Sequence, residues 1–259
     1  DWFIAVTPCN NGIPEEIQKL SLKFEYNNIR SLEELFQQHP DDIAAVILEP
    51  VKSEAPADGF LEKVRELTAK MKTVLIFDEM ITGFRWHLNG AQTMYGVKPD
   101  LTTFGKGCAN GFSVSVLGGK REIMELGGLD HNKPRVFLLS CTHGAEATGL
   151  AAAIKNIEIF KRDNVVSHHW EFGKKFKHGI NSIAKDLGLS DNFKISGFDC
   201  SPIIEALNRD GKSDPGFYTL FCQEMISKGV LINWVAFSKA HGDAELEITM
   251  DAAKHALSI

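Results

Sequence analysis

The sequence lacks long apolar runs, paired cysteines and an excess of positive charge. No run approaches the roughly 18 apolar residues that a membrane span needs, and no charged-then-apolar leader opens the chain, so we expect a soluble protein with no membrane partner. The five cysteines are scattered without a CxxC pair, which is typical of a reducing compartment and favours the cytoplasm. The formal net charge of −6 gives no electrostatic reason to expect a nucleic acid as partner.

Metal-binding and nucleotide-binding patterns are also missing. The close histidine pair, His168 and His169, points to different faces of a predicted helix, so we expect no metal site. The glycine-rich stretch GKGCANG (105–111) has the spacing of neither a dinucleotide loop nor a Walker loop. The chain starts at Asp1 without a methionine, and we expect it to be the later part of a longer polypeptide.

The first half of the chain alternates strand and helix patterns. With 44% hydrophobic and 24% charged residues, the composition is that of an ordinary globular protein. Short apolar stretches of strand length occur at 43–50, 73–79, 101–106, 113–119 and 136–140. Amphipathic helical patterns lie between several of them. This alternation predicts an α/β fold with a mainly parallel sheet and helices on both faces.

The second half has a different pattern. Apolar residues at helical spacing predict a long helix over 143–160 and a second one over 165–187. The stretches 193–198 and 202–208 are predicted to pair as strands, and Asp214 followed by proline is typical of a helix start. We therefore expect an α+β region and a domain boundary near residue 160.

Three charged residues fall where predicted strands end. Glu49 follows the first apolar stretch, Asp78 ends the second, and Lys106 follows the third. The carboxyl ends of parallel strands share one edge of a sheet, where ligands gather. An acid facing a cationic ring and a lysine facing a carbonyl would suit a pyridoxal phosphate site, with the lysine as its Schiff-base partner. The residues alone leave a simpler reading open, in which Asp78 caps a helix and Lys106 decorates the surface.

Three longer stretches carry a family resemblance: FDEMITGFR (77–85), PDLTTFGKGCANGFSVSVLGGKREIME (99–125) and LLSCTHGAEATGLAAA (138–153). They resemble the class III, fold type I pyridoxal-phosphate aminotransferases, most closely the group around glutamate-1-semialdehyde 2,1-aminomutase. The resemblance implies that residues 1–160 are the C-terminal part of the large cofactor-binding domain and that 161–259 form the small C-terminal domain.

The resemblance also implies an activity. The protein would be a cytoplasmic, homodimeric aminotransferase or aminomutase that moves an amino group between a small amine or amino acid and an aldehyde or keto acceptor. Its cofactor would be pyridoxal 5'-phosphate, with pyridoxamine phosphate as the alternate form. Lys106 would form the Schiff base and carry the ketimine/aldimine cycle.

Other residues take their roles from the same resemblance. Asp78, driven into an apolar site, would keep the pyridine nitrogen protonated, and Met80 would press against the ring face. Thr142 would reach the phosphate of the neighbouring subunit's cofactor. Glu79 is expected to be structural, and Arg85 is expected to form a structural ion pair rather than to clamp a substrate.

Some positions depart from the family pattern. Glu54 stands where ornithine- and GABA-type members carry a glutamate and where aminomutases usually have asparagine. The turn after Thr142 reads HGAEAT, with His143 and Glu146, where the family usually has a glycine-asparagine-proline sequence. The candidate substrate residues are therefore Glu49, Glu54 and His143.

Two alternatives to this enzyme stay open. A non-catalytic or incomplete family member would keep the fold as a structural or binding surface. In addition, family members place their phosphate-cradling loop and ring-stacking aromatic residue ahead of the point where this chain starts. We therefore expect the 259 residues alone to bind the cofactor weakly or not at all.

Overall fold

The computed structural model describes residues 7–134, 136 and 144–259. Its strands are β1 (Ala45–Leu48), β2 (Val74–Asp78), β3 (Leu101–Phe104), β4 (Val116–Gly119), β5 (Phe193–Phe198) and β6 (Ser201–Ala206). Its helices are α1 (Glu15–Gln18), α2 (Ile29–Gln38), α3 (Phe60–Lys70), α4 (Ala91–Tyr95), η2 (Lys106–Cys108), α5 (Arg121–Met124), η3 (Glu125–Gly127), α6 (Ala147–Arg162), α7 (Val165–Asp186), α8 (Pro215–Ser227) and α9 (Asp243–Leu257).

The described strands form two separate sheets. The larger has the order β1-β2-β3-β4, and the smaller pairs β5 with β6. The β1–β2 and β2–β3 pairs are parallel, whereas β4 runs antiparallel to β3. The predicted mainly parallel sheet is therefore confirmed, with one antiparallel edge. Four of its five predicted strands are seen, and the fifth, 136–140, lies outside the described residues except for Val136.

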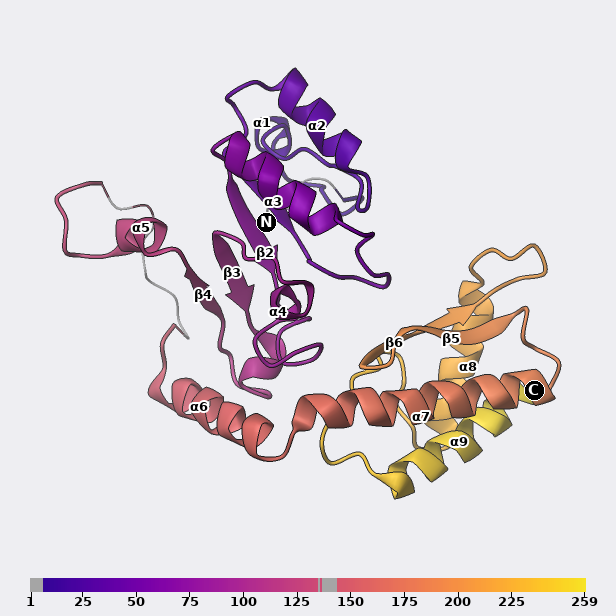
Figure 1. Ribbon diagram of the computed structural model, residues 1–259. Helices are drawn as coiled ribbons and strands as arrows, with labels where there is room; N and C mark the ends of the chain where they lie inside the picture. Colours follow the sequence, from indigo (N-terminus) through magenta and orange to yellow (C-terminus); the bar gives the residue numbers. More distant parts are fainter. Residues whose placement is uncertain (1–6, 135, 137–143) are drawn as a thin grey trace.

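Helices α2 and α3 cover one face of the larger sheet (Figure 1). Leu32 and Phe36 of α2 and Val64 of α3 are buried with Phe77 of β2 in one apolar cluster. The spacing of these residues turns one stripe of each helix toward the sheet, because residues three or four apart share a helix face. The cluster packs against the face of β2 that carries Phe77, and Asp78 lies on the other face.

The C-terminal region has its own core. Helices α7 and α8 pack against the β5–β6 pair, and α9 packs against α7 and α8 (Figure 1). Phe176, Phe193, Phe221 and Met225 are buried in a cluster drawn from these elements. The predicted start of α8 is confirmed, since the side chain of Asp214 accepts a hydrogen bond of 3.0 Å from Phe217 N–H.

The two regions meet through α6 and α7, which follow one another along the chain between the larger and the smaller sheet (Figure 1). A small buried cluster joins them, with Val51, Trp86 and Ala91 on one side and Cys200 on the other. Trp170 of α7 adds a hydrogen bond of 3.1 Å from its indole N–H to the carbonyl of Trp86. These contacts fix the walls of the cleft described below.

Two negative findings hold for this described part of the chain. None of its helices combines the length and apolarity that a membrane crossing requires. None of its groups of histidine, cysteine, aspartate or glutamate has three members placed to hold a metal ion.

Candidate active site

Asp78 lies at the carboxyl end of β2, and the neighbouring strand holds one of its oxygens. Thr103 is its partner in the β2–β3 register, and the Thr103 hydroxyl donates to Asp78 Oδ1 over 3.2 Å. The backbone N–H of Met80 donates to the same oxygen over 3.0 Å. No donor among the described residues reaches Oδ2. Asp78 is thus oriented through one oxygen while the other stays available to a ligand.

The buried carboxylate of this pair is Glu79, not Asp78, which corrects the sequence-based expectation. Side chains alternate between the two faces of a strand. Leu75, Phe77 and Glu79 therefore share the buried face, and Asp78 lies half-exposed on the other. Glu79 is fully buried and bonded within the protein, as expected of a structural residue.

Lys106 begins η2 directly after β3, in an unusual backbone conformation. Its φ is +46°, in the left-handed region that non-glycine residues rarely occupy. The preceding Gly105 is buried, and a Cβ at that position would collide with the end of the Met80 side chain. Asn156 of α6 holds the turn from outside by donating to the carbonyls of Gly107 (2.8 Å) and Cys108 (3.0 Å). Lys106 is one of eight non-glycine residues with a positive φ in the described part of the chain, and residues strained in this way cluster at active sites.

Glu49 follows β1 at the same edge of the sheet, and the charges of Asp78 and Lys106 both act on its carboxyl group. Burial raises the pKa of Glu49 above its usual value. The positive charges of Lys52 and Lys106 oppose this rise, whereas the negative charge of Asp78 adds to it. The structure therefore brings Glu49, Asp78 and Lys106 together, as the strand pattern predicts.

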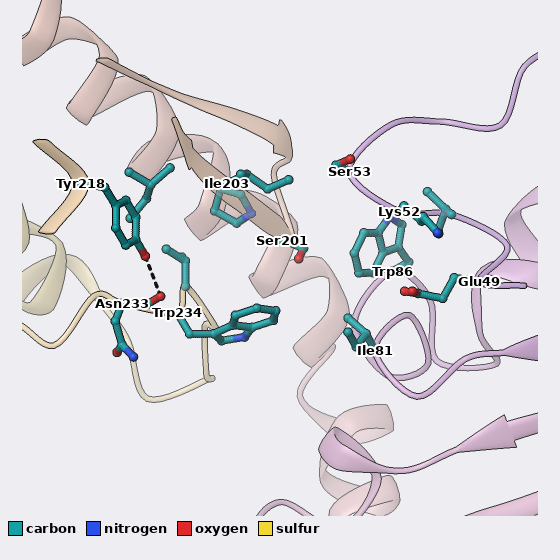
Figure 2. A pocket seen from close by; sticks show the side chains of 14 residues that line it. Glu49, Lys52, Ser53, Ile81, Trp86, Ser201, Ile203, Tyr218, Asn233 and Trp234 are labelled. Carbon is teal, nitrogen blue, oxygen red and sulfur yellow. Dashed lines mark hydrogen bonds between the residues drawn. The ribbon is translucent and has the colours of Figure 1, made fainter. Parts of the chain in front are cut away.

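Two cavities open beside this edge. The first, of about 310 Å³, lies between the two regions of the chain and has aromatic walls from Trp86, Tyr218 and Trp234, with Glu49 at one end (Figure 2). The second, of about 210 Å³, includes Lys106 in its lining. Both cavities share Ile81, Ser201 and Trp234, so they are neighbours in one cleft. The arrangement combines a lysine, an oriented carboxylate and an aromatic slot.

Comparison with known proteins identifies this arrangement. A family model described as aminotransferase class-III matches residues 7–237. The chain belongs to the class-III aminotransferase family.

Relatives in this family share about a third of its residues. The 3-aminobutyryl-CoA aminotransferase of Cloacimonas acidaminovorans (strain Evry) is 33% identical over 100% of this chain and 62% of its own length. The glutamate-1-semialdehyde 2,1-aminomutase of Thermosipho africanus (strain TCF52B) is 36% identical over 94% of this chain and 60% of its own. The chain thus spans about three fifths of the length of these relatives.

Solved structures agree in fold. The internal aldimine form of the Sphingopyxis sp. MTA144 FumI protein, which contains pyridoxal phosphate, superposes with a TM-score of 0.87 at 24% identity, over 97% of this chain and 60% of that one. An omega-transaminase from Sphaerobacter thermophilus gives a TM-score of 0.83 at 25% identity, also over 97% and 60%. The class-III chain therefore has the fold type I architecture of these transaminases.

Three residues that the family resemblance predicts for the site are not part of the described cleft. Thr142 and His143 lie outside the described residues. Glu54 is exposed in the loop after β1 and lines neither cavity. Its negative charge acts on Tyr26, whose pKa is raised mainly by burial. No arginine among the described residues forms an ion pair with Glu54, so its predicted role as partner of a substrate-binding arginine stays a prediction.

Arg85 is predicted from the sequence to form a structural ion pair. Its guanidinium forms no ion pair with a carboxylate of the described residues, and its buried Nη1 has no hydrogen-bond partner there. The predicted structural ion pair has no partner among the described residues and stays a prediction. Sequence reasoning also missed His169, Trp234 and Lys239 as cavity residues, because their approach to Lys106 depends on how α7 and the segment before α9 fold back.

Proposed function

We propose that this chain supplies the lysine and the acidic residue of a pyridoxal-phosphate enzyme that moves an amino group between a small amine or amino acid and an aldehyde or keto acceptor. The observation that carries the proposal is the pairing of Asp78 and Lys106 at adjacent strand ends, with Lys106 in a left-handed conformation. Membership of the class-III family supports the same reaction class.

The described residues fit the cofactor. Asp78 has one oxygen held by Thr103 and Met80, and its Oδ2 could accept a hydrogen bond from a protonated ring nitrogen. A protonated ring nitrogen beside Asp78 would be favoured, because an opposite charge nearby stabilises the charged form of a titratable group. The Met80 side chain, packed over Gly105, would contact the ring face. Thr142 remains the proposed contact to the phosphate of a neighbouring subunit.

When bound, pyridoxal phosphate supplies an aldehyde and an electron-withdrawing ring. Lys106 would anchor the aldehyde through Nζ, yield that position to the substrate amine, and then hold and move a proton at Nζ. Asp78 would keep the ring nitrogen protonated throughout. The aromatic walls of the 310 Å³ cavity would exclude water from the substrate, and Glu49 at its end would orient a donor group.

The finer points of the proposal rest on the family. The relatives described above include both an aminotransferase and an aminomutase, and we propose either reaction for this protein. We further propose a homodimer in the cytoplasm, with a domain boundary near residue 160. Exposed apolar residues on α6, Leu150 and Ile154, are compatible with a subunit interface.

The test uses the full-length protein that contains this chain. Added pyridoxal phosphate is expected to give a yellow absorption band, and borohydride reduction should then fix the cofactor on Lys106, as peptide mapping would reveal. Lys106→Ala should lose the band and all turnover. The matched control, Lys161→Ala at the exposed end of α6, should keep both. Label scattered over surface lysines, or turnover by Lys106→Ala, would contradict the proposal and favour a non-catalytic relative.

A further inference from the structure

Helix α6 turns one narrow buried stripe toward the turn that carries Lys106. Gly149 and Asn156 are the buried residues of this helix. They lie seven positions apart, so they share one face of α6. A Cβ at Gly149 would lie 2.9 Å from Cγ2 of Val114, in the segment that follows the turn. Glycine therefore allows α6 to approach this segment closely, and Asn156 faces the turn itself.

Asn156 uses both N–H bonds of its side-chain amide on the Lys106 turn. Its Nδ2 donates to the carbonyls of Gly107 (2.8 Å) and Cys108 (3.0 Å), which an amide group with two N–H bonds can do at once. Asn156 is 8% exposed and Cys108 is 3% exposed, so these hydrogen bonds are shielded from water. No other donor among the described residues reaches either carbonyl. Without the amide, both acceptors would lose their protein partner.

The turn needs this support because its backbone is strained. Lys106 has a φ of +46° and Asn110, at the other end of the turn, has a φ of +47°. Residues in this region keep their conformation only where the surrounding structure fixes it. The Lys106 side chain is exposed and lines the 210 Å³ cavity, so the backbone of the turn sets the direction in which the side chain leaves the chain.

We propose that Asn156 is a positioning residue, which holds the Lys106 turn in the conformation that directs Nζ toward the aldehyde of pyridoxal phosphate. The inference rests on the proposed function of Lys106. In the step concerned, the neutral amine of Lys106 forms a C=N bond to the aldehyde carbon and the aldehyde oxygen leaves as water, so no oxidant or reductant takes part. Asn156 acts on the rate of this step through the carbonyls of Gly107 and Cys108.

The experiment separates cofactor binding from bond formation in the full-length protein freed of cofactor. Pyridoxamine phosphate has an amine in place of the aldehyde and forms no bond to Lys106, so calorimetry with this probe measures binding alone. With pyridoxal phosphate, the rate at which the yellow band appears measures bond formation. Asn156→Leu removes both N–H donors at similar size. It should slow the appearance of the band by about 10- to 100-fold and leave the Kd of pyridoxamine phosphate unchanged, because only the geometry of the lysine is disturbed.

A graded variant and a matched control accompany this test. Asn156→Gln keeps both N–H donors on a longer stem, and its rate should lie between those of the wild type and Asn156→Leu. The control is Asn181→Leu on α7. Asn181 also fixes backbone, since it donates to the carbonyl of Ile195 (2.9 Å) and accepts from the N–H of Ile195 (2.7 Å) in the C-terminal core. Its replacement should lower the melting temperature and change neither probe.

Two results would overturn the inference. In the first, Asn156→Leu forms the yellow band as fast as the wild type does. In the second, Asn156→Leu weakens pyridoxamine phosphate binding as much as it slows the band, which would make Asn156 a direct cofactor contact or a general support of the fold. Thermal unfolding shows whether Asn156→Leu folds, and Asn156→Gln provides a second folded variant. Failure of the proposed function looks different, because the wild type itself would then form no band and borohydride would leave no label on Lys106; that result would overturn both.

Discussion

The buried carboxylate of Glu79 accepts hydrogen bonds of 2.7 Å from the backbone N–H groups of both Ala91 and Gln92. These two groups belong to the first turn of α4, whose N–H groups have no partner within the helix. Thr82 donates to the same carboxylate. Glu79 thereby ties the loop after Asp78 to α4 and fixes the shape of the strand end.

Removing this carboxylate should destabilise the protein strongly. In Glu79→Ala, two backbone N–H groups lose their acceptor in a fully buried site, and each such loss costs about 1–3 kcal/mol. We expect the free energy of unfolding to fall by about 2–5 kcal/mol in urea titrations. The adjacent Asp78→Ala is the control, because Asp78 is half-exposed. It should cost under about 1.5 kcal/mol and instead weaken cofactor binding. Equal stability losses in the two variants would contradict this assignment.

Gly90 is expected to be irreplaceable for the same reason. Its φ is +84°, and a Cβ there would lie 2.5–2.8 Å from the carboxylate atoms of Glu79. Gly96 is a matched control, since its φ is +67° and nothing lies within 4 Å of an added Cβ. Gly96→Ala has the left-handed backbone cost of about 1–2 kcal/mol. Gly90 has a ψ of 162°, in a region that is essentially restricted to glycine, and Gly90→Ala also disrupts the Glu79 hydrogen bonds. Melting temperatures should therefore fall clearly further for Gly90→Ala. Matching decreases would argue against tight packing here.

These residues illustrate how far the sequence predicts the site. Runs of apolar residues are sufficient to place the strands, and parallel strands bring their carboxyl ends together, so the meeting of Glu49, Asp78 and Lys106 is predictable. Alternation along β2 predicts that Asp78 and Glu79 face opposite ways, but which face is buried depends on where α2 and α3 pack. Which of the two carboxylates is buried can therefore be predicted only from the tertiary structure.

The cavity around Arg85 could not be predicted from local patterns. Arg85, His169 and Lys239 are far apart in the sequence and meet only because α7 and the segment after α8 return to the sheet. Helix starts, in contrast, can be predicted from local sequence. The Asp214 cap was predictable from Asp-Pro, which combines a capping side chain with a fixed φ at the first helical position.

The strained backbone of Lys106 gives a prediction that separates folding from chemistry. Both Lys106→Ala and Lys106→Gly should lose turnover. Since Lys106 has a φ of +46°, alanine keeps the strain and glycine relieves it. Chemical denaturation should therefore find Lys106→Gly more stable than Lys106→Ala by about 1 kcal/mol. If glycine proves less stable than alanine, Lys106 does not hold a left-handed conformation in solution.

The buried His169 predicts a loss of stability in mild acid. Its pKa is about 4 in the folded protein, mainly because of burial, against an ordinary value of 6.5. Between these values the unfolded chain binds a proton that the folded chain does not, so the stability contributed by neutral His169 is complete above pH 6.5 and is lost as the pH falls toward 4. The loss from this group approaches about 3 kcal/mol.

Urea titrations at a series of pH values test this against His169→Phe. Phenylalanine suits the site, because the ring of His169 already packs edge-on against Phe160 with centroids 6.0 Å apart. The variant cannot take up the proton, so its unfolding free energy should fall less steeply than that of the wild type over this pH range. Parallel pH curves for the two proteins would mean that His169 titrates alike in the folded and unfolded chain.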